Sequence, residues 1–318
     1  MADREHLPLQ KYADQLITLF QSAITSKDPA VFLYKNEART PLFMAESLAR
    51  LMCKINPGHR IEKALKAFKK PEDLLGEADH YDSFNKQFSK NKAVSKAQLD
   101  YLVKKRNKAF KKLNEKLPEK DYYQEPFNRL AAEKINFEDI KLISGIEKQI
   151  RTELKDSAGF FAKYPEKFTD LESQVHEIRR KLRWISIYSQ SLQGIIVLKT
   201  QKTKPSWEKE FQSKTSLSSA FNKLPLKKGL AKHIYFNRNA FYALTYTIDR
   251  LGVIKDQAQA IEVLAKSIKK TGALVDESYI ETAIKQLGVK YTEKDLMQDA
   301  HELLEKFFVT YKIHEKLL

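Results

Sequence analysis

Cysteine is nearly absent from this 318-residue chain, in which Cys53 is the one example. A single thiol excludes a disulfide within the chain and a metal site built from several cysteines. No apolar run reaches the length of about 18 residues that a membrane-spanning helix needs. The first residues lack the basic and then apolar pattern of a signal peptide. These features predict a soluble protein of the reducing cytoplasm.

Glycine and proline are also scarce, at 9 and 10 residues. Runs of β-branched residues are rare, whereas the helix-favouring residues Lys, Glu, Leu and Ala dominate. The composition therefore predicts an all-α protein. A hydrophobic fraction of 42% is that of an ordinary folded chain, and the length suffices for two medium-sized domains.

Acidic residues are too few to balance the basic ones. The chain has 41 Asp and Glu against 57 Lys and Arg, and its formal net charge is +16. Such an excess informs about partners rather than about fold. Nucleic acid, polyphosphate and acidic membrane surfaces are the natural candidates.

Hydrophobic periodicity predicts helices along most of the chain. In the first half they are expected at 7–26, 40–55, 59–69, 71–88 and 93–117, with two more within 122–154. In the second half they are expected at 165–198, 233–250, 251–270, 278–287 and 293–313. Residues 199–229 are rich in Ser, Thr and Lys and are expected to be irregular, with at most short helices.

The stretch SQVHEIRRKLRWISIYSQSL (173–192) carries two stripes at helical spacing. The apolar stripe consists of Val175, Ile178, Leu182 and Ile185. The basic stripe consists of His176, Arg179, Arg180 and Arg183. Like charges at this spacing repel one another, and a phosphate held by the planar guanidinium forks would relieve the repulsion. The alternative is a solvated face whose arginine stems cover the edge of the core.

A second basic face is predicted on the helix at 93–117. Its members are Lys104, Lys108, Lys111 and Lys112, which would match spaced phosphates, although lysine runs are often only solvated surface. The nearby cluster of Glu77, Asp79, His80 and Asp82 spreads over two faces of one helix and contains no HExxH motif. It is therefore interpreted as a solvent face, and no metal site is expected.

Two pairs of helices resemble each other in sequence. LLGEADHYDSF (74–84) and LGVIKDQAQAI (251–261) each carry a Leu-Gly pair followed by Asp. Upstream, PLFMAESLARLMCKI (41–55) can be laid on QVHEIRRKLRWISIY (174–188), so that Arg50 falls on Arg183, Phe43 on His176 and Glu46 on Arg179. These matches predict an internal repeat. One bundle is expected in 1–160 and a second in 161–318, with an insertion at about 199–229.

The run His176-x-x-Arg179-x-x-x-Arg183, followed by Leu251-Gly252 and Lys255-Asp256, resembles the conserved histidine α-helical domain (CHAD) family. The resemblance covers about 40–313 and implies two related antiparallel helical bundles around long basic helices. It also implies binding of inorganic polyphosphate in a basic groove, often on polyphosphate granules, without catalysis. The first half departs from the family pattern, because Phe43 and Glu46 stand where its His and first Arg would be.

The sequence thus predicts a non-catalytic, polyanion-binding protein without cofactors, with inorganic polyphosphate as the leading ligand. The expected contacts are His176, Arg179, Arg180, Arg183, Arg50, Lys104, Lys108, Lys111, Lys112 and Lys255. One alternative is a helical nucleic-acid-binding protein, in which aromatic residues such as Trp184 and Tyr188 would stack on bases. Another is an enzyme for a phosphorylated substrate, which would need carboxylates or a metal in the groove.

Overall fold

The computed structural model describes residues 8–119, 125, 127, 128, 135, 137, 139–226, 229–272 and 278–318. Within these residues the fold is all-α, as predicted, apart from two short strands. The helices of the first half are α1 (Pro8–Ile24), α2 (Pro29–Lys35), α3 (Arg39–Ile55), α4 (His59–Phe88), α5 (Lys96–Lys116) and α7 (Ile140–Phe161). Those of the second half include the π-helical turn η1 (Leu171–His176), α8 (Glu177–Ser191), α10 (Arg238–Thr271), α11 (Tyr279–Leu287) and α12 (Glu293–Glu305). The C-terminal turns are η4 (Lys306–Thr310) and η5 (Ile313–Lys316).

The helix predicted at 165–198 is shorter than expected. It comprises η1 and α8 and ends at Ser191, because Gln193 and Gly194 adopt left-handed φ values of 47° and 95°. The β-branched residues that follow form β1 (Ile196–Lys199), which pairs in parallel with β2 (Ile234–Asn237). In the described residues between the strands, 200–226 and 229–233, the helices are the short η2 (Glu208–Phe211), α9 (Lys214–Ser218) and η3 (Ala220–Asn222), as expected for 199–229.

Two helices are longer than expected. α4 continues through Pro71, whose buried position in the core compensates for the missing hydrogen bond. α10 runs over 34 residues without a break at Leu251. Of the two helices predicted within 122–154, the second is α7, and most of the first lies outside the described residues.

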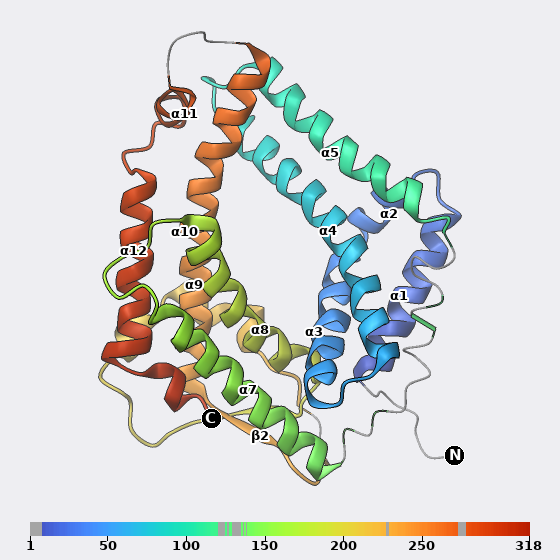
Figure 1. Ribbon diagram of the computed structural model, residues 1–318, viewed down its shortest axis with the longest axis vertical. Coiled ribbons are helices and arrows are strands. Elements are labelled where there is room, and N and C mark those ends of the chain that lie inside the picture. The colour runs from blue at the N-terminus through green and yellow to red at the C-terminus, as the bar shows by residue number, and fades with distance from the viewer. Residues whose placement is uncertain are drawn as a thin grey trace.

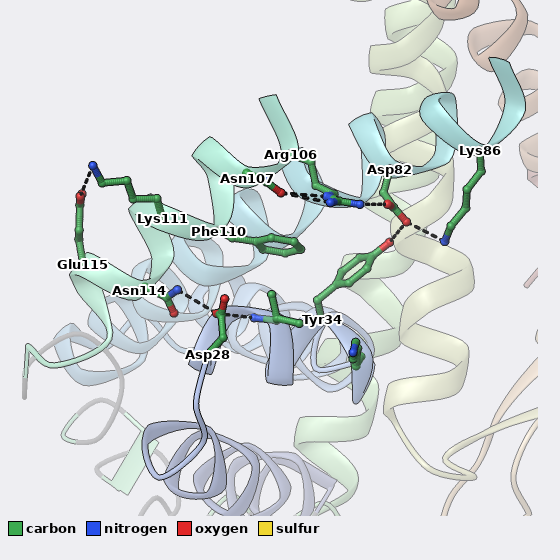
Figure 2. Close-up of a pocket in the computed structure, with 12 residues that line it drawn as sticks. Asp28, Tyr34, Asp82, Lys86, Arg106, Asn107, Phe110, Lys111, Asn114 and Glu115 are labelled. Carbon is green, nitrogen blue, oxygen red and sulfur yellow. Dashed lines mark hydrogen bonds and ion pairs between the residues drawn. The ribbon is translucent and has the colours of Figure 1, made fainter. Parts of the chain in front are cut away.

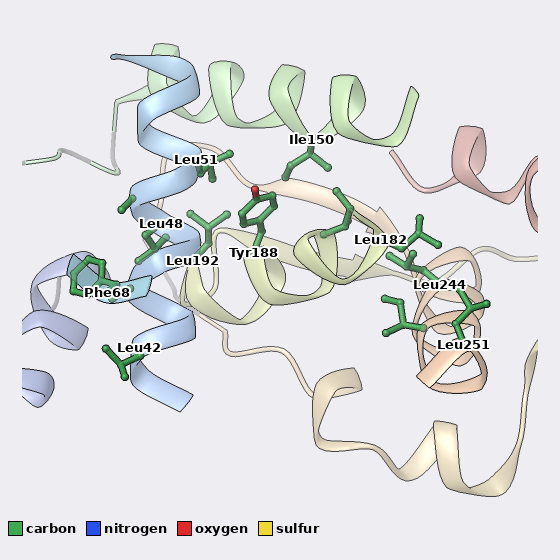
Figure 3. Close-up of a cluster of buried hydrophobic side chains, with 14 of the residues drawn as sticks. Leu42, Leu48, Leu51, Phe68, Ile150, Leu182, Tyr188, Leu192, Leu244 and Leu251 are labelled. Atoms are coloured by element: carbon green, nitrogen blue, oxygen red, sulfur yellow. The ribbon is translucent and has the colours of Figure 1, made fainter. Parts of the chain in front are cut away.

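The main hydrophobic core joins the two halves of the chain. Leu48 of α3, Ile150 of α7, Tyr188 of α8 and Leu244 of α10 are all 0% exposed and meet in one cluster (Figure 3). The predicted apolar stripe on η1 and α8 lies in the same core, which confirms its inward orientation. Burial of each such side chain stabilises the folded state by about 1.5–3 kcal/mol. The division into two bundles stays a prediction, because both halves share this core.

A smaller cluster, here called the distal core, lies at the far ends of the long helices. It contains Phe84 and Phe88 of α4, Leu102 of α5, and Leu264 and Ile268 of α10, with α11 packed against them. Figure 1 shows α10 extending from the main core to this cluster, where the upper ends of α4 and α5 approach it. The helices α4 and α10 are therefore fixed at both ends. None of the described helices combines the length and the apolar character needed to cross a lipid bilayer.

Candidate functional site

A groove of about 490 Å³, here called the basic groove, lies between the α3–α4 pair and the η1–α8 helix, and Lys255 of α10 also lines it. Four acidic residues line it together with eight Arg and Lys residues, so its net charge is positive. The basic residues are Arg39, Arg50, Lys69, Arg179, Arg180, Lys181, Arg183 and Lys255. Because the charges gather in a concave site, the groove is suited to an anionic ligand.

Helical periodicity places these side chains. On α3 the groove-lining residues are Arg39, Phe43, Glu46 and Arg50, which share one face because they are spaced by three or four residues. On η1 and α8 the corresponding face carries His176, Arg179, Arg180, Arg183 and Ile187. The two helices pack directly, and the Ser47 hydroxyl donates a buried hydrogen bond of 2.8 Å to Ser191 Oγ. Close packing of α3 against α8 thus brings the two faces together.

Six of the residues predicted from the sequence meet in the basic groove. They are His176, Arg179, Arg180, Arg183, Arg50 and Lys255. The structure does not bring the four predicted lysines of α5 to this groove. Lys104 and Lys108 are exposed, and Lys112 pairs with Glu77 at 3.6 Å.

Lys111 of α5 lines a separate cavity between α2, α4 and α5 (Figure 2). Asp82 also lines that cavity, and it is buried and accepts hydrogen bonds from Tyr34 Oη at 3.0 Å and Arg106 Nη1 at 2.7 Å. The interpretation of the acidic cluster on α4 as a solvent face is therefore wrong for Asp82. Its charge is balanced by Arg106 and by Lys86, 2.7 Å away.

Arg50 is held in place from behind by a buried network. Its Nε donates to Tyr188 Oη at 3.0 Å, and Tyr188 Oη donates to Glu153 at 3.1 Å. Glu153 is 5% exposed and also accepts a hydrogen bond of 2.9 Å from Lys54. Burial raises the pKa of Tyr188 well above its usual range, so the phenol stays protonated and donates. The network orients Arg50 and leaves one side of it facing the groove.

Arg183 differs from the other arginines of the groove. It forms neither a hydrogen bond nor an ion pair with any residue that the structure describes. Its guanidinium lies 4.7 Å from the centre of the Phe43 ring. Burial, together with the positive charges of Arg179 and Arg39, lowers the pKa of Arg183 to about 10. At neutral pH the protein therefore carries a half-buried, uncompensated cation in the groove, and a bound anion would balance it.

Arg179 and Arg39 each lie against a helical glycine in the same way. Arg39 Nη2 lies 2.9 Å from the position that a Cβ would occupy at Gly76, and Arg179 Nη2 lies 3.0 Å from the equivalent position at Gly252. Both arginines direct Nε toward the residue four positions before that glycine. Arg39 Nε donates to Glu72 Oε1 at 2.9 Å, and Arg179 Nε donates to the Ile248 carbonyl at 3.2 Å. Each glycine thus leaves room for a guanidinium beside its helix. The positions of Arg39 at Gly76 and of Arg179 at Gly252 are here called the first and second glycine seats.

The two seats differ in charge. Arg39 is balanced by Glu72 and by Asp79, whose Oδ2 lies 3.1 Å from Nη1. At the position equivalent to Asp79, three residues after Gly252, the second half has Lys255. Arg179 forms no ion pair within the described part of the chain, and burial lowers its pKa. Of the two arginines, Arg179 at the second glycine seat is therefore the one whose positive charge is available to a ligand.

These seats give a different register for the proposed repeat. They match Arg39 with Arg179, whereas the sequence alignment laid Glu46 on Arg179 and Arg50 on Arg183. The Leu-Gly helices keep the register expected from the sequence, with Gly76 matched to Gly252. A shift of about two helical turns on α3 preserves the apolar stripe, so the stripe alone does not distinguish the two registers.

His176 is half-buried at one end of the groove, and its Nδ1 has no hydrogen-bond partner among the described residues. Burial lowers the pKa of His176 below its ordinary 6.5. The imidazole is therefore neutral at physiological pH. In this state one ring nitrogen carries a proton that it can donate to a ligand oxygen.

Glu46 is a buried carboxyl among these cations. It is 7% exposed and has no hydrogen bond or ion pair to any described residue. Burial and the charge of Glu72 raise its pKa from the ordinary 4.5 to about 7. Between these two values the folded protein holds a proton that the unfolded chain has released. The contribution of Glu46 to stability should therefore fall as pH rises from 4.5 to 7 and change little above that, which a comparison of wild type and Glu46→Gln by urea denaturation across this range would measure.

The aromatic residues of the groove are already engaged by arginines. Phe43 has Arg39 over its ring at 5.1 Å as well as Arg183, and Trp184 has Arg50 over its ring at 5.1 Å. Each such cation–π contact stabilises the position of its guanidinium by about 0.5–2 kcal/mol. In this arrangement the rings position cations rather than offer free faces for bases to stack upon.

The glycine seats lead to a first prediction. Gly252→Ala should weaken polyphosphate binding about fivefold, because the new Cβ displaces Arg179 and removes about 1 kcal/mol of hydrogen bonding to the ligand. Helix propensity favours Ala over Gly, so thermal stability should change little. Gly76→Ala is the matched control, since the Arg39 that it displaces is already paired with carboxylates. Equal loss of affinity in the two variants would contradict the distinction between the seats.

Comparisons with known proteins found no match for the chain. No family model, no curated protein and no solved structure matches it significantly. No group of three or more potential metal ligands occurs among the residues described. The chemistry of the basic groove is therefore what points to a function.

Proposed function

We propose that the protein binds a phosphate-rich polyanion in the basic groove, with inorganic polyphosphate as the leading ligand, and that it does so without catalysis. The observation that carries this proposal is the half-buried charge of Arg183, which has no hydrogen bond or ion pair to any described residue and lies near the positive charges of Arg179 and Arg39. A guanidinium that is kept partly out of water without a partner lowers stability, and a phosphate oxygen would remove that cost. The side chain is thus better explained by a ligand than by the fold.

The engaged aromatic rings favour polyphosphate over nucleic acid. Sequence-independent binding of single strands relies on aromatic faces that accept bases. In the basic groove the rings of Phe43 and Trp184 lie under guanidiniums instead. A chain of bare phosphates needs only the cations.

Membership of the CHAD family belongs to the same proposal, as do a cytoplasmic location and an association with polyphosphate granules. The paired seats at Gly76 and Gly252 support the internal repeat on which the resemblance depends. The acidic partners of Arg39 suggest that the second repeat alone contributes most of the affinity.

A competition titration tests the proposal. Labelled long-chain polyphosphate is bound at near-physiological salt and challenged with single-stranded DNA, RNA and duplex DNA at equal phosphate concentration. We expect polyphosphate to remain bound, and its affinity to fall steeply with added salt because each neutralised phosphate releases counterions. Displacement by one nucleic acid would favour a nucleic-acid-binding protein, and release of orthophosphate during incubation would favour an enzyme.

A further inference from the structure

Glu46 is the one groove-lining carboxyl that the described interactions leave without a cation of its own. Glu72 pairs with Arg39, Asp73 pairs with Lys69, and Glu177 pairs with Arg180. Glu46 has no such partner, although it is buried in the same groove as the equally unpaired Arg183. The two groups are close enough for the charge of Glu46 to affect Arg183, yet they form no ion pair. Both side chains line the groove.

We propose that Glu46 belongs to the anion site in its protonated form, donating a hydrogen bond to a ligand oxygen that Arg183 also binds. This inference rests on the proposed function and specifies how the same site is regulated. A protonated carboxyl donates one hydrogen bond, whereas a carboxylate only accepts and repels an anion. Each occupied site therefore retains one proton on Glu46, and loss of that proton releases the ligand.

The surroundings of Glu46 favour this protonation. The charged and titratable groups that line the groove with it are Arg39 and Arg50 on α3, Lys69, Glu72 and Asp73 on α4, Glu177, Arg179, Arg180, Lys181 and Arg183 on α8, His176 on η1 and Lys255 on α10, with Glu153 of α7 behind Arg50. The nearby carboxylates Glu72 and Asp73 oppose ionisation, while Lys69 and Arg50 favour it less strongly than burial opposes it. A phosphate in the groove adds further negative charge and opposes ionisation of Glu46 as well.

The proposal predicts binding that depends on pH in a particular direction. The pKa of Glu46, about 7, implies that its protonated fraction falls from about 90% at pH 6 to about 10% at pH 8. The affinity for long-chain polyphosphate should therefore fall about tenfold over this range at constant salt. Long chains are the appropriate probe, because only their two terminal phosphates titrate near neutral pH.

The decisive variants are Glu46→Gln and Glu46→Ala, compared by titration with labelled long-chain polyphosphate at pH 6 and pH 8. Glu46→Gln keeps a donor and should bind equally at both values, as tightly as the wild type at pH 6. Glu46→Ala removes the donor and should bind several-fold more weakly than Glu46→Gln at both. Circular dichroism checks that both variants are folded.

Two control variants separate Glu46 from its neighbours. Glu177→Gln removes a groove carboxylate that is already paired, so it should raise affinity equally at both pH values and keep the tenfold ratio. His176→Asn removes the imidazole and should also keep the tenfold ratio between the affinities at pH 6 and pH 8. A wild type that binds equally at pH 6 and pH 8, or a Glu46→Gln variant that keeps the ratio, would overturn the inference while leaving polyphosphate binding intact. Absence of binding by every variant at both pH values would overturn the proposed function together with it.

Discussion

Replacing Arg183 with methionine should weaken polyphosphate binding about 100-fold and at the same time stabilise the protein. A bidentate guanidinium–phosphate contact is worth about 3 kcal/mol, which corresponds to about two decades in Kd. Methionine retains the apolar contact with Phe43 but removes a charge that has no hydrogen-bond or ion-pair partner among the described residues. We expect a gain of about 1–2 kcal/mol in the free energy of unfolding. Urea denaturation measures the gain, and titration with labelled polyphosphate measures the loss.

Arg180→Met is the matched control on the same helix. The side chain of Arg180 is 60% exposed and pairs with Glu177, so its loss should lower affinity less than tenfold and leave stability almost unchanged. A stability loss in Arg183→Met would show that Arg183 has a structural role. Unchanged affinity in that variant would remove Arg183 from the site.

Replacing Glu153 with glutamine should have the largest effect on stability. Glu153 is 5% exposed and accepts hydrogen bonds from Lys54, Tyr188 and Gln149. Loss of its charge leaves Lys54 and Arg50 without a carboxylate. Removing one partner of a fully buried pair costs about 3–5 kcal/mol, and because these two cations are about one-third exposed we expect about 2–3 kcal/mol. Urea denaturation at neutral pH measures this cost.

Glu147→Gln provides the comparison on the same helix, α7. Glu147 pairs with Arg151 and Lys232 near the surface, and its replacement should cost less than about 1 kcal/mol. Tyr188→Phe should fall between the two, at about 1 kcal/mol, because it removes one buried hydroxyl while the carboxylate remains. Equal stability of Glu153→Gln and Glu147→Gln would mean that the buried network contributes nothing.

The sequence allowed the all-α fold and the orientation of the basic helix to be predicted. The stripe of Val175, Ile178, Leu182 and Ile185 is fully buried, because an amphipathic helix of this length has one way to face a core. The continuity of α4 through Pro71 was not predictable from local signals, since tertiary packing compensates for the missing hydrogen bond. The two short strands escaped prediction because they adjoin strong helical patterns.

The predicted ligand contacts fall into two groups, those that the structure places in the basic groove and those that it does not. Membership depends on whether local sequence alone determines where the residue lies. The cluster on η1 and α8 converges because its members share one helical face. Arg39 and Glu46 were missed as members of the groove because periodicity does not reveal which helix packs against α8. The lysines of α5 form an equally regular face, but α5 packs along α4 and away from the groove. Spacing identifies a face, and only packing decides what that face meets.

The distal core has a consequence for the order of folding. It joins α4 and α5 to α10 and α11, and residues 117–237, more than a third of the chain, lie between these two segments. Closing so long a loop is entropically costly, so contacts of this kind form after the local helix pairs have assembled. The basic groove needs α4 and, through Lys255, α10 in place, and it is therefore complete only when α10 has docked. A partly folded chain would present scattered positive charges, and the convergent set of cations that forms the groove would exist only in the folded protein.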